Sequence, residues 1–207
     1  FDGITYAKGA AVLKQLVAWV GDDAFYEGAR RYFAEHQFGA TNLQDLLVAL
    51  EGASRQELSS WKSAWLETSG PSRLSASWTD AVGAITDFTL HQGGEACNGV
   101  LRPHRVTVST WRVAAGALER THAFDVRIDG ESAGIDPEGV LAVPGGAASA
   151  DLVVVNDDDL TYAISRLDER STDVALAYVG TIEAPITRAV IWASLWNAVR
   201  DGLLDPR

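Results

Sequence analysis

Methionine is absent from this 207-residue sequence, which begins at Phe1. We therefore expect a piece excised from a longer protein, and the absence of a leader says nothing about targeting. Cysteine occurs once, at Cys97, which excludes a disulfide framework within the chain and fits a reducing compartment, so we expect a cytoplasmic location. No apolar run reaches the roughly 18 residues of a membrane span, so no membrane partner is expected.

Positive charge is also scarce, with 17 Lys and Arg against 28 Asp and Glu and a formal net charge of -11. A nucleic acid partner needs a basic face, so this composition argues against one. The motifs H-E-x-x-H, G-x-S-x-G, Walker A and G-x-G-x-x-G are all missing. The four histidines are scattered, so we expect neither metal ligands nor a cofactor-binding motif among these residues.

Apolar spacing divides the chain into three parts and predicts an α+β fold. Residues 1–70 carry apolar stripes at helical spacing, and they end at the strong stop signal Ser69-Gly70-Pro71. Residues 71–167 alternate like short strands, which predicts a small β-sandwich. Residues 168–207 are helical again. Their helical pair has an uncovered apolar face, which predicts the start of a longer helical array.

Local signals make four sharper predictions. Thr41, with Gln44 three residues later, has the form of a capping box at a helix start. Asp129-Gly130 is a hairpin turn signal. Leu152–Val155 is a short, fully apolar strand. Pro185 suits the first turn of the last helix, which Gly202 follows.

Chemistry is hard to assign from local pattern alone. Residues 156–159 could form a calcium loop, but the EF-hand Gly and Glu are missing, so a solvated turn is favoured. Residues 102–105 could bind an anion, but a strand entry with exposed charge is favoured. Cys97 is expected to be an inert thiol. Tyr6 is either an ordinary tyrosine at a helix start or a hydrogen-bond donor to an oxyanion.

Residues 4–10, Ile-Thr-Tyr-Ala-Lys-Gly-Ala, resemble a segment of the aminopeptidase N and puromycin-sensitive aminopeptidase family, which are zinc metallopeptidases of the gluzincin type. The family pattern is roughly I-[ST]-Y-x-K-G-[AS]. The resemblance extends in order along essentially the whole chain. Arginine outnumbers lysine and alanine is abundant, which indicates a bacterial member. The further segments that carry the resemblance are residues 21–28, 31–33, 40–46, 65–71, 102–105, 155–163 and 188–201.

The resemblance implies the C-terminal part of a thermolysin-like catalytic domain at 1–70, a β-sandwich at 71–167 and the start of a helical solenoid at 168–207. It implies that the zinc ligands and the residues that capture the substrate's α-amino group lie upstream of this piece. The substrate would be a peptide with a free N-terminus. Tyr6 would hydrogen-bond the tetrahedral oxyanion, whereas Lys8 and Gly9 would serve packing.

On this interpretation the isolated piece is inactive and carries one catalytic residue, Tyr6. Two alternatives stay open. One is a non-catalytic family member that acts as a scaffold or a peptide-binding module. The other is a bifunctional epoxide hydrolase-aminopeptidase.

Overall fold

The computed structural model describes residues 3–81, 83–93, 99–134 and 149–206. Contacts divide the chain into two compact units, Phe1–Thr68 and Ser69–Arg207. The expected boundary near residue 70 lies within two residues of this division, and no division falls at residue 168. Helices and two sheets are both present, so the prediction of a mixed fold is confirmed, whereas the thermolysin-like and solenoid assignments stay predictions.

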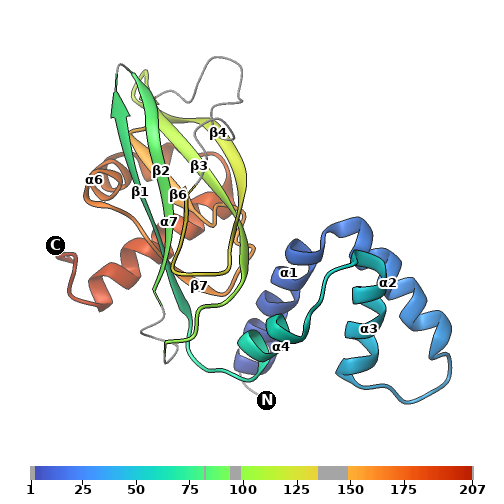
Figure 1. The fold of residues 1–207 in the computed structure, drawn as a ribbon. Coiled ribbons are helices and arrows are strands. Elements are labelled where there is room, and N and C mark those ends of the chain that lie inside the picture. The colour runs from blue at the N-terminus through green and yellow to red at the C-terminus, as the bar shows by residue number, and fades with distance from the viewer. Residues whose placement is uncertain (1–2, 82, 94–98, 135–148, 207) are drawn as a thin grey trace. The chain divides into compact units, whose positions relative to one another are not determined.

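The first unit is entirely helical within its described residues (Figure 1). Its buried apolar side chains come mainly from α1, α3 and α4 and include Leu16, Leu47 and Leu50. Trp61 and Trp65 stack one turn apart, with ring centroids 6.0 Å from each other, and both are buried. The elements are η1 (Ile4–Lys8), α1 (Gly9–Val20), α2 (Asp22–Glu35), α3 (Leu43–Ser54) and α4 (Ser59–Leu66).

The crossing of α2 and α3 depends on a glycine. A Cβ placed on Gly28 would lie 2.8 Å from Leu50 Cδ2, 3.0 Å from Leu50 Cα and 3.1 Å from the Ala49 carbonyl oxygen. Two of these three neighbours are backbone atoms, which cannot rotate away. The two helices therefore approach as closely as they do because residue 28 has no side chain.

The helix α3 begins one residue later than its predicted capping box. Asn42, not Thr41, is the N-cap: its Oδ1 accepts from the backbone N–H of Gln44 at 2.7 Å and of Asp45 at 3.3 Å. Asp45 Oδ2 in turn accepts from the backbone N–H of Asn42 at 2.9 Å. The predicted pairing was therefore wrong by one position, because Asn is at least as good a cap as Thr and its partner at N3 is then an acid.

The second unit begins with two sheets. One has strand order β5-β2-β1-β7 and the other has order β4-β3-β6. Leu74, Phe88 and Leu90 of the first sheet share one buried cluster with Val106 and Val126 of the second, so the two sheets pack face to face. The strands are β1 (Ser72–Ala81), β2 (Ala84–Gly93), β3 (His104–Ala114), β4 (Ala117–Ile128), β5 (Ser132–Gly134), β6 (Leu152–Val155) and β7 (Ala163–Arg166).

Helices cover the other face of the second sheet. In β6, Val153 and Val155 face the cluster between the sheets, whereas Leu152 and Val154 face a second cluster. That second cluster is completed by the helices α6 (Glu169–Tyr178) and α7 (Pro185–Arg200) and the short turn η3 (Val179–Thr181). Figure 1 shows α6 and α7 in the second unit. Because β6 is covered on both faces, all four of its residues are apolar and buried, as its continuous apolar sequence predicted.

The turn prediction at Asp129-Gly130 was wrong. The strand before it, β4, pairs with β3, whereas the strand after it, β5, pairs with β2 in the other sheet. The chain therefore crosses between sheets here instead of forming a hairpin. The tight hairpin of this region is β3–β4, which turns at Ala115 (φ 50°) and Gly116 (φ 83°). Positive φ at both positions is typical of a two-residue hairpin turn. Ala is not one of the residues that favour this conformation, so the sequence did not predict the turn.

Candidate functional site

Tyr6 lies in the middle of η1, a five-residue π-helical turn that leads directly into α1. A π-helical turn is wider than an α-helical one and is found frequently at functional sites. The backbone N–H of Gly9 donates to the carbonyl of Tyr6, which closes the junction between the two elements. The chain thus holds Tyr6 on the first turns of a helix whose other end is anchored by the buried Leu16 and Val20.

The Tyr6 side chain points to solvent within its unit, with 70% of its surface exposed. No residue that the structure describes forms a hydrogen bond with its hydroxyl. A phenol placed in this way can donate a hydrogen bond to a ligand without first breaking one within the chain. Its role as an oxyanion donor stays a prediction.

The packing role expected for Gly9 is not supported. Its backbone is helical, with φ -58° and ψ -46°, and a Cβ placed on it would meet no atom within 4 Å. Neither backbone conformation nor crowding among the described residues therefore requires glycine there.

The described residues do not fit a zinc ion. Within the ranges 3–81, 83–93, 99–134 and 149–206, no group of three or more His, Cys, Asp or Glu side chains is close enough to hold a metal. His36 ends α2, His91 and His104 lie on different sheets, and His122 is on β4. Cys97 lies outside the described residues, so its expected inertness is not tested. No chemical step can be assigned through a metal from these residues.

Residues 102–105 lead into β3, which begins at His104, so the predicted strand entry is correct. The predicted exposure is wrong, because Arg102 is 1% and His104 0% exposed. His104 Nε2 lies 3.1 Å from Gln92 Oε1, which also accepts from the backbone N–H of Arg102 at 2.9 Å. Since Gln92 Nε2 donates to the Arg102 carbonyl at 3.0 Å, the Gln92 oxygen faces the ring and His104 Nε2 carries the proton. Thr161 then donates to Nδ1 at 2.8 Å.

This arrangement requires a neutral imidazole. Burial, and secondly the positive charge of Arg102, lower the pKa of His104 to about 3. A histidine that stays neutral and fully bonded near pH 7 is a structural link between strands, not a proton-transfer group.

The acidic run at residues 156–159 forms the predicted turn but is only partly solvated. Asn156 and Asp157 are buried, whereas Asp158 and Asp159 are exposed. Asn156 has φ 64°, and its Oδ1 accepts from the backbone N–H of Leu160 at 2.8 Å, so its amide builds the turn. Asp157 Oδ2 lies 3.4 Å from Arg120 Nη1, whereas its Oδ1 is buried without a hydrogen-bond partner in the described part of the chain.

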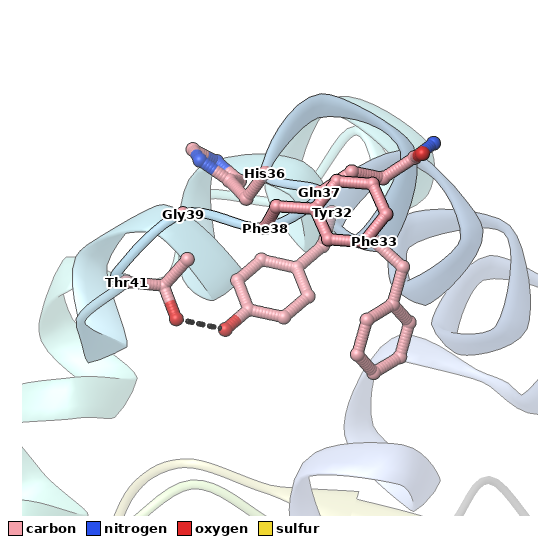
Figure 2. Close-up of a pocket in the computed structure, with 7 residues that line it drawn as sticks. All are labelled: Tyr32, Phe33, His36, Gln37, Phe38, Gly39 and Thr41. Carbon is pink, nitrogen blue, oxygen red and sulfur yellow. Dashed lines mark hydrogen bonds between the residues drawn. The ribbon is translucent and has the colours of Figure 1, made fainter.

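Figure 2 shows a hollow in the first unit that the sequence did not indicate. Its volume is about 410 Å³. The Tyr32 hydroxyl lies 2.5 Å from Thr41 Oγ1, so Thr41 fixes this ring instead of capping α3. Phe38, fully exposed with φ 59°, stands at its edge. Three of its lining residues are aromatic: Tyr32, Phe33 and Phe38. Its lining residues are Tyr32, Phe33, His36, Gln37, Phe38, Gly39 and Thr41.

Comparison with known proteins identifies the class. Residues 1–65 match the peptidase family M1 domain, and the whole chain aligns with an aminopeptidase N. The resemblance to the aminopeptidase N family, first noted at residues 4–10, is thereby confirmed.

Two similar proteins are both named aminopeptidase N. The aminopeptidase N of Streptomyces lividans is 44% identical to this chain over 217 residues, which cover 100% of this chain and 24% of the relative. That of Lactococcus lactis subsp. lactis is 42% identical over 81 residues, which cover 39% of this chain and 10% of the relative. The chain therefore spans about a quarter of the length of the Streptomyces relative.

A solved structure has the same fold. The aminopeptidase A of Legionella pneumophila, crystallised in complex with aspartic acid, superposes with a TM-score of 0.68 at 16% identity. The match covers 100% of this chain and 23% of that chain. None of the described helices of the present chain is both long and apolar enough to cross a membrane.

Proposed function

We propose that this chain is part of a cytoplasmic zinc-dependent aminopeptidase that removes N-terminal residues from peptides with a free N-terminus. In this proposal the zinc ion is held by residues outside those that the structure describes, and this chain contributes Tyr6. The match to the peptidase family M1 domain supports the reaction class, and the exposed hydroxyl at the π-helical turn supports the role of Tyr6. No described residue favours the scaffold or the epoxide hydrolase alternative.

The proposed role of Tyr6 follows from the charge that develops during peptide hydrolysis. As water adds to the scissile carbonyl, negative charge moves onto the carbonyl oxygen. A fixed hydrogen-bond donor stabilises this oxyanion more than it stabilises the bound peptide, so it lowers the barrier without tightening substrate binding. Tyr6 suits this role because its backbone is fixed by the helix and its hydroxyl has no competing partner among the described residues.

The test is the substitution Tyr6→Phe in the active aminopeptidase that contains this chain. We expect kcat to fall by about 10²–10³ with KM nearly unchanged, because the lost bond forms mainly in the transition state. The control is Tyr26→Phe, which removes the hydroxyl of another exposed tyrosine in the same unit, 61% exposed on α2. Its turnover should stay within a few-fold of wild type.

Metal content and thermal stability are measured on both variants, and neither should change. If Tyr6→Phe turns over at a rate within a few-fold of wild type, Tyr6 has no part in the mechanism.

A further inference from the structure

A row of polar side chains crosses the outer face of the four-stranded sheet. Ser75 of β1 is in register with His91 of β2 on one side and with Arg166 of β7 on the other. His91 is in turn in register with Ser132 of β5. Since neighbours in register point to the same face, Ser132, His91, Ser75 and Arg166 form one row. Arg73 lies two residues before Ser75 and therefore on the same face.

The opposite face of these strands belongs to the core. Leu74 and Leu90, the neighbours of Ser75 and His91 along their strands, are 0% exposed and pack between the two sheets. The row is therefore held on a rigid support. It lines a hollow of about 790 Å³, to which Arg73, Ser75, His91 and Arg166 all contribute.

The two arginines share a single carboxylate. Arg166 Nη2 contacts Asp201 Oδ2, and Arg73 Nη2 lies 3.3 Å from the same oxygen. Arg166 is well covered, with 14% of its side chain exposed. Two guanidinium groups therefore share one carboxylate oxygen at this end of the row.

Hydrogen-bond capacity is also left over. A guanidinium has five N–H donors. Arg73 Nε and Arg166 Nη1 are both buried and make no hydrogen bond with any residue in the described part of the chain. Glu131, which also lines the hollow, precedes β5 at the far edge of the sheet. The strand β5 lies two strand spacings, about 10 Å, from Arg73 on β1 and three, about 14 Å, from Arg166 on β7, so the attraction of Glu131 for the two arginines is weakened by distance and by salt.

We propose that the outer face at Arg73 and Arg166 is an anion-binding site that takes a small oxyanion of the carboxylate or phosphate type beside Asp201. Such an anion supplies several acceptor oxygens in one plane or tetrahedron, which matches the spare donors of two guanidinium groups. Ser75 and His91 extend the site along the row. This inference is independent of peptide hydrolysis and of Tyr6.

The experiment titrates the whole chain with inorganic phosphate, and separately with acetate, at constant ionic strength set with sodium chloride. Binding is followed by calorimetry and by the Nε–Hε resonances of the arginines. We expect saturable binding, tighter for phosphate, with shifts at Arg73 and Arg166. Arg166→Gln should weaken phosphate binding about tenfold, because a charged donor is removed.

Asp201→Asn gives a prediction of opposite sign. It removes the carboxylate that competes for the same donors, so phosphate binding should strengthen about threefold. Matched controls are Arg105→Gln and Asp125→Asn, which break an exposed ion pair of 2.6 Å on the other sheet with the same changes of charge. Neither control should alter phosphate affinity.

The Asp201→Asn variant keeps the proposal testable even if Arg166→Gln does not fold. Binding that fails to saturate, or that responds equally to the site variants and the controls, would overturn the proposal.

Discussion

The contact between α2 and α3 gives a prediction whose size can be worked out from the structure. Replacing Gly28 with Ala should favour the helix α2 by about 1 kcal/mol through backbone entropy. The added methyl would, however, lie 3.0 Å from Leu50 Cα and 3.1 Å from the Ala49 carbonyl oxygen. Overpacking of this kind costs about 1–3 kcal/mol, and backbone neighbours put it in the upper part of that range. We expect a net loss of about 1–2 kcal/mol.

The matched control is Gly52→Ala in α3, the partner helix. A Cβ there would meet only Arg31 Nη1, at 3.8 Å, and residue 52 is exposed. With the same gain in helix preference and no clash, this variant should be stabilised by about 0.5–1 kcal/mol. The two alanines should thus move stability in opposite directions.

Equilibrium unfolding in urea, followed by circular dichroism, measures the two changes. Because the chain has two compact units, a single transition cannot be assumed, so amide hydrogen exchange of α2 and α3 assigns each change to the first unit. A shift of 1 kcal/mol corresponds to about 4–8 °C in Tm for a unit of this size. If Gly28→Ala is as stable as Gly52→Ala, the close approach of the two helices is not maintained in solution.

Three further predictions concern stability. His104 has a pKa of about 3 in the folded chain against 6.5 for its ordinary value, so below pH 6.5 only the unfolded state takes up its proton, and stability should fall by about 1.4 kcal/mol per pH unit down to pH 3. His104→Asn should remove this contribution from the pH dependence of unfolding, and an unchanged slope would contradict the buried neutral ring. Asn42→Ala should destabilise α3 by about 1 kcal/mol in urea unfolding, whereas Asn42→Ser should retain most of the cap, and equal losses would exclude the cap. Ala115→Gly should stabilise the β3–β4 hairpin by about 1 kcal/mol in thermal unfolding, since Ala115 has φ 50°; a loss of stability would show that this turn conformation is wrong.

The sequence predicted elements well where a strong local signal leaves few alternatives. The strand at Leu152–Val155 and the helix that begins at Pro185 are as expected, because continuous burial and a proline at the first turn leave few alternatives. The failures are local. Two adjacent polar residues, Thr41 and Asn42, could each cap α3, and the pattern could not choose between them.

The polar residues were harder to predict, because burial of charge depends on partners far away in the sequence. The buried His104 forms hydrogen bonds with Gln92 and Thr161. The sequence around residues 102–105 does not indicate either partner. Likewise, Arg73 and Arg166 are 93 positions apart and meet only because β1 and β7 pair. Tyr6 was found through a family resemblance, since an exposed tyrosine at a helix start has no distinguishing local pattern.

The pairing of β1 with β7 also has a consequence for synthesis on the ribosome. β1 occupies residues 72–81, but its parallel partner at 163–166 emerges only after some eighty further residues have been made. Until then one side of β1 is an unpaired edge, able to pair with any other exposed strand. Parallel pairing over such a separation forms slowly, because a long loop must close first. The nascent chain therefore passes through a stage in which residues 1–68 have been made while this edge of the second unit is still open to mispairing.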